Sequence, residues 1–250
     1  MTGRSLKLSG RWLLSVLMVS ALSACAVSPA KRQAADDVVA LHHASLSEVS
    51  RQVADWPLPA LPEPEQGRHR LMVIERGDDS LALRLHLIRT AVRSIDIQNY
   101  IFLVDDSGKL LLDELVAAAQ RGVRVRLLVD SLFSLPDEQL LASLELAHPG
   151  FELRLYRPLL NQAVVTDAEF LSAIVCCFGR LNQRMHNKLM VVDARHALVG
   201  GRNNSARYFD LDTRMVFLDL EVLVSGPVVA EMQQGFDRFW ADPLAVPPRY

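Results

Sequence analysis

Beyond residue 67 the chain alternates between strand-like and helix-like patterns of apolar residues. The runs typical of β-strands are 71–75, 94–103, 123–130 and 151–156. Apolar residues recur at helical spacing between them, over 80–92, over 107–122 and from Pro136 to about residue 147. We expect Ser80 and Ser107 to cap the first two helices and Gly122 to end the second.

Strands separated by helices of this length are usually joined by right-handed parallel crossovers. The pattern therefore predicts a layered α/β fold. Half of the 250 residues are apolar, so the chain can bury a substantial core. The sequence contains no internal repeat.

The first 25 residues form a targeting pattern rather than a part of the fold. Basic residues at 4, 7 and 11 precede an apolar run, 12–22, that is too short to span a bilayer. The run leads into Ser23-Ala24-Cys25, which resembles the lipobox of bacterial lipoproteins. The resemblance implies acylation of Cys25 and an outer-membrane position facing the periplasm, which Ala26 favours. A plain secretory peptide and an uncleaved anchor are the alternatives.

The sequence is thereby divided into four parts. Residues 1–24 are the expected lipoprotein signal peptide, and 25–67 are an expected tether with a Pro-rich end. Residues 68–243 are the expected single domain, and 244–250 are a C-terminal tail.

Composition narrows the classes of function. There are 27 basic and 29 acidic residues, for a net charge of −2, which excludes a broad cationic surface for binding along duplex nucleic acid. Three cysteines cannot make a disulfide scaffold. Cys176 and Cys177 are adjacent in an apolar run, and we expect an unbridged pair in or near the core.

The chemistry is concentrated between residues 185 and 203. Period-two alternation along Met185–Asp193 predicts a strand with His186 and Lys188 on one face, and Asp193 ends it at a turn. A second strand leads to Gly200-Gly201 and Asn203, and we expect a helix near Ser205. A neutral imidazole suits attack on a phosphodiester, while an ammonium and an amide can hold phosphoryl oxygens. Glycines and a helix N-terminus would add close backbone N–H groups.

The pattern His-x-Lys-x4-Asp followed by x6-Gly-Gly-x-Asn resembles the HKD motif of the phospholipase D superfamily. The resemblance extends from about Leu71 to Pro243, and it is strongest to the N-terminal half of bacterial cardiolipin-synthase-like members. It implies a phospholipase D-like α/β/α sandwich with a mixed, largely parallel central sheet. It also implies chemistry that needs no metal and no cofactor.

The family's functional residues carry over to matching positions. His186 would be the nucleophile that forms a phosphohistidine, or else its acid/base counterpart. Lys188 and Asn203 would bind the phosphate beside Gly201, and Asp193 would support the motif by organising the turn.

Other charged residues near the motif leave alternatives open. Asp219 and Glu221 are two residues apart on an expected strand, where one of them could orient His186 or both could be surface charges. Three arginines, Arg180, Arg184 and Arg202, could attract a phosphate headgroup or be salt-paired.

One motif is half of a catalytic centre in this superfamily, because two HKD motifs face each other. The sequence contains a single His-x-Lys-x4-Asp. Three interpretations are open. The chain could be a homodimer with a composite site, the N-terminal half of a two-motif enzyme, or a lipoprotein that binds phosphate without turnover. We favour the N-terminal half, since the resemblance is to the first halves of two-motif proteins.

The resulting hypothesis is a membrane-tethered phosphodiesterase or phosphatidyltransferase that acts on phospholipid head groups. Its expected partners are a phospholipid substrate, the membrane through the N-terminal lipid anchor, and a homodimer mate or C-terminal HKD half. A non-catalytic lipoprotein half-domain and a nuclease of the same superfamily are the alternatives. Head-group preference, and hydrolysis as against transfer, depend on features outside the motif.

Overall fold

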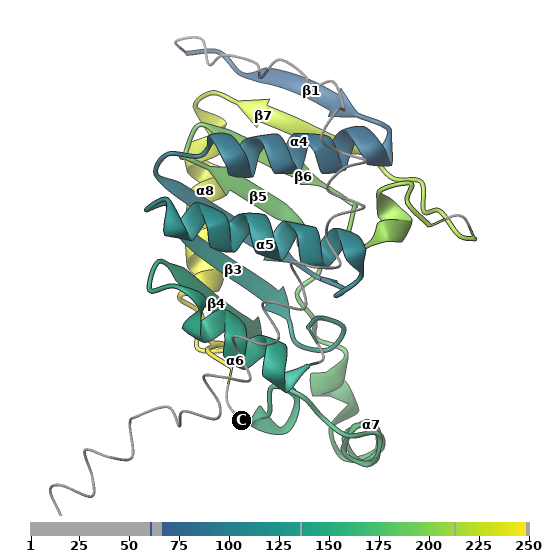
Figure 1. The fold of residues 1–250 in the computed structure, drawn as a ribbon. Coiled ribbons are helices and arrows are strands. Elements are labelled where there is room, and N and C mark those ends of the chain that lie inside the picture. The colour runs from purple at the N-terminus through teal and green to yellow at the C-terminus, as the bar shows by residue number, and fades with distance from the viewer. Residues whose placement is uncertain (1–60, 62–66, 136, 213, 249–250) are drawn as a thin grey trace, which may run out of the picture.

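The computed structural model describes residues 61, 67–135, 137–212 and 214–248 (Figure 1). The expected signal peptide, Cys25 and nearly all of the expected tether lie outside these residues. The strands are β1 (Arg70–Ile74), β2 (Ser94–Asn99), β3 (Arg124–Asp130), β4 (Phe151–Tyr156), β5 (Leu189–Val192), β6 (His196–Gly200), β7 (Glu221–Ser225) and β8 (Ala245–Val246). The helices are α4 (Gly77–Thr90), α5 (Asp106–Gln120), α6 (Glu138–Ala147), α7 (Asp167–Leu181) and α8 (Val228–Trp240), with 3₁₀ turns η1 (Leu159–Asn161) and η2 (Ala206–Tyr208).

The strands form one mixed sheet in the order β1-β7-β6-β5-β2-β3-β4-β8. Parallel pairing is confined to β2–β3 and β3–β4, which helical crossovers connect. The other neighbouring pairs are antiparallel. The mixed α/β sandwich is confirmed, but its strand pairing is less parallel than expected. The reason is that β5 and β6 are joined by a tight turn, which only an antiparallel pair permits.

Helices cover both faces of this sheet (Figure 1). One core lies between α4–α6 and the sheet, and it takes alternate strand residues such as Ile95, Ile97, Val125, Leu127 and Val129. On the other face α8 packs against β3 through Phe236, Trp240 and Leu128, and against β5–β7 through Val229, Val191 and Val224. Burial of both faces explains the apolar run 127–129 of β3, whereas β2 alternates apolar residues with the buried polar residues Asp96 and Gln98.

The helix caps differ from the expected serines. Helix α4 begins at Gly77, and Ser80 lies inside it with its hydroxyl donating to Glu221. Helix α5 is capped by Asp105, whose carboxylate accepts from the Gly108 amide at 3.1 Å. A carboxylate at this position also stabilises the positive end of the helix dipole.

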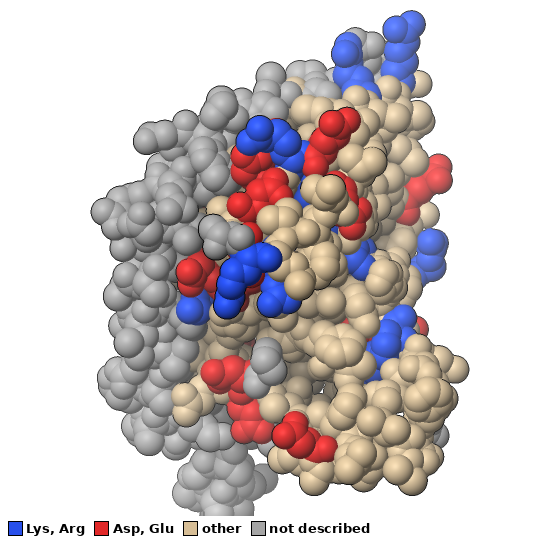
Figure 2. Space-filling model, turned by 90° about the vertical axis from the view of Figure 1, so that its right-hand side faces the viewer, with Lys and Arg blue, Asp and Glu red and all other residues tan. Residues whose placement is uncertain are grey.

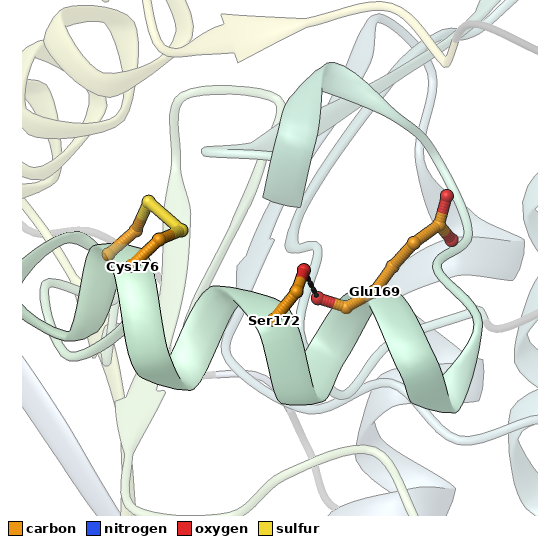
Figure 3. Close-up of a disulfide and its surroundings, with 4 residues drawn as sticks. Glu169, Ser172 and Cys176 are labelled. Atoms are coloured by element: carbon orange, nitrogen blue, oxygen red, sulfur yellow. Dashed lines mark hydrogen bonds between the residues drawn. A yellow bond between two sulfur atoms is a disulfide. The ribbon is translucent and has the colours of Figure 1, made fainter.

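Cys176 and Cys177 lie on α7, away from the main core, and are joined by a disulfide (Figure 3). The expectation of an unbridged core pair is wrong in both respects. Neighbouring apolar residues of α7 are exposed, including Leu171, Val175 and Phe178, so the apolar run does not mark a core segment. Cys177 also leaves the helical conformation, with φ −141° and ψ 27°.

Two kinds of feature are absent from the described part of the chain. No helix within it is both long and apolar enough to cross a membrane. No three His, Cys, Asp or Glu side chains in it gather where a metal ion could be held.

Candidate active site

His186 lies on an extended segment just before β5, which begins at Leu189 rather than at residue 185 as expected. Its imidazole is exposed and packs on Tyr100, with ring centroids 4.6 Å apart. Tyr100 follows the end of β2, the strand that pairs with β5. The aromatic contact therefore places the imidazole at the carboxyl end of β2.

Lys188 is the cation of the site. Its side chain is only 7% exposed, and its Nζ lies 3.4 Å from both ring nitrogens of His186 and 2.9 Å from the His186 carbonyl oxygen. Nζ also lies 5.1 Å from the centroid of the Tyr100 ring. Burial lowers the pKa of Lys188 below its ordinary 10.5, although the charge of Asp219 opposes the shift. Among the described residues this ammonium has no ion-pair partner within 4 Å, so it is available to an anion.

Asn203 lies at the same end of the sheet, but its side chain is buried and already hydrogen-bonded within the protein. Its side chain is 3% exposed: Oδ1 accepts from the Ile101 amide at 3.2 Å, and Nδ2 donates to the Tyr208 hydroxyl at 3.0 Å. The amide keeps one hydrogen that Tyr208 does not use. Asn203 therefore fixes the loop after β2 as well as facing the site's end of the sheet.

Gly201 lies directly against the side chain of Asp219. A Cβ at position 201 would overlap the Asp219 carboxylate. That carboxylate also acts on Lys188 through its charge, so Asp219 belongs to the surroundings of the site.

Glu221 is part of a buried network rather than the site. Its carboxylate accepts from Arg84 at 2.6 and 2.8 Å and from the Ser80 hydroxyl. Burial alone would raise the pKa of Glu221, but the charge and hydrogen bonds of Arg84, with Ser80 and Arg202, hold it below its ordinary 4.5. Of the two acidic residues proposed to orient His186, the structure therefore ties Glu221 to α4.

Asp193 lies at the opposite end of β5 from Lys188. Its carboxylate accepts from the amides of Val92, Arg93 and Ser94 at 2.7 to 3.3 Å. These contacts connect the β5–β6 turn to the segment that enters β2, and none of them involves the His186 imidazole.

The helix expected near Ser205 is only the short turn η2. Its first amide, that of Ala206, donates to Asp105, and the Arg207 amide donates to the Ser205 hydroxyl. The turn therefore does not offer the free N–H donors that the sequence suggested.

The arginines near the motif are salt-paired or bonded to backbone. Arg184 pairs with Asp130 at 2.7 Å, and Arg202 is buried, donating to the carbonyls of Tyr208, Glu75 and Asp219. The Arg180 side chain lies outside the described residues.

Sequence reasoning missed Asp130 and Tyr100. The Asp130 carboxylate accepts from the Met185 amide at 3.0 Å and from Arg184 Nε at 2.9 Å, so it holds the segment directly before His186. Its position at the end of strand β3 was the available signal, because residues at carboxyl ends of neighbouring parallel strands meet at one edge of a sheet. Tyr100 lies within the predicted strand run 94–103 and directly follows the end of β2.

Figure 2 shows the side of the molecule on which α7 and η2 lie. Basic and acidic residues are interspersed in its upper part, and uncharged atoms cover most of its lower part (Figure 2). No broad cationic surface is visible on this face outside the atoms drawn in grey.

Comparisons with known proteins match most of the described part of the chain. The family model described as "Cardiolipin synthase, PLD-like domain" matches residues 85–240. Cardiolipin synthase C of Escherichia coli (strain K12) is 40% identical over 179 residues, which are 70% of this chain and 36% of that protein. Cardiolipin synthase B of Salmonella typhimurium (strain LT2) is 32% identical over 166 residues, 66% of this chain and 37% of that protein. The chain thus spans little more than a third of these relatives.

Solved structures share the fold at low sequence identity. NucT from Helicobacter pylori has a TM-score of 0.54 at 14% identity, covering 72% of this chain and 99% of that one. The phospholipase D family member Nuc from Salmonella typhimurium has a TM-score of 0.51 at 18% identity, covering 73% and 100%. Phosphatidylserine synthase from Haemophilus influenzae Rd KW20 has a TM-score of 0.54 at 16% identity, covering 81% and 43%.

Proposed function

Because the chain belongs to the cardiolipin synthase family of phospholipase D-like domains, we propose that it is a phosphodiesterase or phosphatidyltransferase acting on phospholipid head groups. The observation that carries the proposal is the pairing of His186 with Lys188. An exposed imidazole lies 3.4 Å from a buried ammonium that has no carboxylate partner within ion-pair distance among the described residues. Such a pair combines a nucleophile with a fixed charge for the phosphoryl group.

In the proposed reaction a ring nitrogen of His186 attacks the phosphorus of the lipid, and the bond from phosphorus to the head-group oxygen breaks. A second histidine protonates the departing alcohol. The same histidine then removes a proton from water or an acceptor alcohol, which attacks phosphorus and breaks the bond to His186. Lys188, and Asn203 through its remaining amide hydrogen, stabilise the charge on the phosphoryl oxygens.

The second histidine must come from another HKD motif, because the sequence has one. A second copy of this chain or a further HKD segment would supply it. The shared fold makes up nearly all of NucT and Nuc and 43% of the phosphatidylserine synthase, so it occurs both as nearly a whole chain and as part of a longer one. Acylation at Cys25 would hold that unit beside lipid at the periplasmic face of the outer membrane.

The test is turnover of phosphatidylglycerol carrying a labelled head group, in vesicles with the full chain. The proposal expects release or exchange of the label, and loss of at least about a thousandfold in His186→Ala. His86→Ala is the matched control, since His86 lies on α4 and outside the site. Unchanged release in His186→Ala would contradict the proposal.

The same preparation distinguishes the alternatives. A nuclease would cleave labelled single-stranded DNA in a His186-dependent manner while leaving lipid intact. A non-catalytic half-domain would do neither even when a second HKD segment is supplied, and either of these results would contradict the lipid proposal.

A further inference from the structure

Cys176 and Cys177 form a disulfide between adjacent residues of α7 (Figure 3). Cys176 is exposed and Cys177 is half-buried, so thiols in solution can reach the bridge. A bridge between neighbours closes no long loop and therefore does little to restrict the unfolded chain. Exposed disulfides are also the ones that exchange most readily with other thiols. The placement of this bridge favours reversible chemistry over a stabilising role.

The bridge is incompatible with an unbroken helix. Successive side chains of an α-helix point about 100° apart around its axis, which keeps the sulfur atoms of adjacent cysteines apart. The structure shows the consequence, because Cys177 has φ −141° and ψ 27° where helical values are about −63° and −42°. The disulfide therefore goes with a break in α7 at Cys177, and opening the disulfide would let this residue return to the helical conformation.

The two parts of α7 on either side of this break are held differently. The first turn is fixed by a capping box, in which the Glu169 amide donates to the Thr166 hydroxyl at 3.3 Å and the Thr166 amide donates to the Glu169 carboxylate at 2.8 Å. The part after Cys177 resumes helical hydrogen bonding, with the Asn182 amide donating to the Phe178 carbonyl at 3.1 Å. A change of backbone direction at Cys177 would therefore displace the part after it relative to the fixed first turn.

The second part of α7 leads directly into the candidate active site. Only residues 182–185 separate the end of the helix from His186. The carbonyl of Gln183 accepts from Arg157 at 3.1 Å, and Arg184 is held by its ion pair at the end of β3. A displaced helix end pulls on these contacts, and through them on the position of the imidazole.

We propose that Cys176 and Cys177 are a reversible redox site that sets the position of the His186 segment. In the disulfide form, which the structure shows, α7 is broken at Cys177 and the imidazole packs on Tyr100 beside Lys188. In the dithiol form α7 is continuous and the contacts after its end loosen, which moves the imidazole away from the ammonium. The effect on turnover rests on the proposed function, and the effect on the structure does not.

The reductant is a dithiol, of a small molecule or of a protein. One of its thiolates attacks Sγ of Cys176, the exposed partner, the bond between the two cysteine sulfurs breaks, and Cys177 leaves as a thiolate. The second thiolate attacks the dithiol's own sulfur in the mixed disulfide, which releases Cys176 and closes the dithiol's disulfide. Two electrons and two protons pass from the dithiol to the cysteine pair. Exchange with a disulfide of the same class reverses these steps.

The first test follows the bridge and the helix in the full chain. Dithiothreitol is expected to raise the number of alkylatable thiols by two per molecule, whatever the state of Cys25, and diamide is expected to restore the starting number. Hydrogen–deuterium exchange of the amides 177–181 is expected to slow at least about threefold on reduction, because they gain regular helical hydrogen bonds. A pair that stays reduced without dithiothreitol, or exchange rates that are the same in both forms, would overturn the proposal.

Paired variants separate the bridge from other effects of changing α7. Cys176→Ser with Cys177→Ser cannot form the bridge, and it is expected to exchange like the reduced wild type with or without dithiothreitol. Val175→Ser, at an exposed position of the same helix, keeps the bridge and is the matched control. A double variant that exchanges like the oxidised wild type would contradict the link between the bridge and the break in α7.

The position of His186 can be measured without any turnover. Diethyl pyrocarbonate acylates accessible imidazoles, and mass spectrometry gives the rate for each histidine. We expect the rate at His186 to be at least about twofold higher in the double serine variant than in the oxidised wild type, because the imidazole leaves Tyr100. The rate at His69, an exposed histidine next to β1, is expected to be the same in both proteins. Equal rates at His186 would overturn the link between the cysteine pair and the site.

Turnover separates this inference from the proposed function. With a second HKD segment supplied, the oxidised wild type is expected to consume labelled phosphatidylglycerol at least about threefold faster than the reduced wild type, and reoxidation is expected to restore the rate. The double serine variant is expected to keep the lower rate in both conditions. Equal rates in the two forms of the wild type would overturn the regulatory role. If neither form consumes lipid, the proposed function fails, whereas the exchange and acylation rates still decide whether the pair controls the segment.

Discussion

Lys188 shows how function and stability conflict at one position. Its ammonium is buried beside His186, and burial lowers its pKa, which means that the fold disfavours the charged form. An anionic substrate would restore the lost solvation. A buried cation whose pKa is perturbed near a nucleophile is a usual sign of a functional site.

Lys188→Met should therefore abolish turnover and raise the free energy of unfolding by about 0.5–2 kcal/mol, because the methionine removes a buried charge. Chemical denaturation of the purified variant measures the change. A loss of stability beyond about 1 kcal/mol would show that the hydrogen bond to the His186 carbonyl outweighs the desolvation of the ammonium.

The lowered pKa of Lys188 also predicts a pH dependence of kcat/KM. As pH rises through the folded-state pKa, which is below 10.5, the ammonium loses its proton and the phosphoryl oxygens lose their cation. The alkaline limb of the profile should therefore fall at a pH below 10.5. Lys188→Arg should move that limb to higher pH, since arginine stays protonated. An identical alkaline limb in the variant would assign the titration to another group.

At the scale of elements, two carboxylates that have no hydrogen bond to His186 or Lys188 connect the strands and the helix that position the site. Asp193 connects the β5–β6 turn to the entry of β2, and Glu221 connects β7 to α4 through Arg84. Both connect elements that are distant in sequence, so substituting them tests the stability of the fold rather than the reaction.

Asp193→Ala should lower the free energy of unfolding by about 2–3 kcal/mol, because three backbone amides lose a charged acceptor. The folded fraction should keep its kcat within about twofold, given that Asp193 lies at the other end of β5 from His186. Glu152→Ala, an exposed acidic residue of β4, should change stability by less than about 0.5 kcal/mol. A large loss of kcat with unchanged stability in Asp193→Ala would place Asp193 in the chemistry.

Glu221→Gln should cost about 3–5 kcal/mol at neutral pH, because it leaves Arg84 buried without its ion-pair partner. The pKa of Glu221 is lowered in the folded state, so its contribution is present above about pH 4.5 and is lost as pH falls through the folded-state pKa. The stability difference between wild type and variant should narrow below that range. A pH-independent difference, measured by denaturation between pH 3 and 7, would contradict this account.

The element pattern was largely predictable from sequence, whereas its cross-connections were not. The strand runs and helices follow from apolar spacing, and the proximity of His186 and Lys188 follows from their separation of two residues. The cap of α5 was missed because Asp105, two residues before Ser107, takes the same role, and α4 has no side-chain cap at its N-cap residue Arg76. The pairing of Arg84 with Glu221 joins residues 137 apart, and local pattern carries no such information. The exposure of α7 was missed because an apolar run is ambiguous between core and surface.

At the scale of the whole molecule, the candidate site lies at one end of the sheet and contains one HKD motif. A composite site made by two copies would make specific activity rise with protein concentration until the dimer forms. Light scattering on the same samples should show the mass doubling over that range. Full activity in a strict monomer with a single motif would contradict a shared centre.

The most direct test of the central claim is the consumption of head-group-labelled phosphatidylglycerol by the full chain in vesicles, compared with His186→Ala. The account predicts that wild type releases or transfers the label, and that His186→Ala loses at least about a thousandfold of this activity. Consumption that survives His186→Ala, or its absence in wild type even when a second HKD segment is supplied, would contradict it.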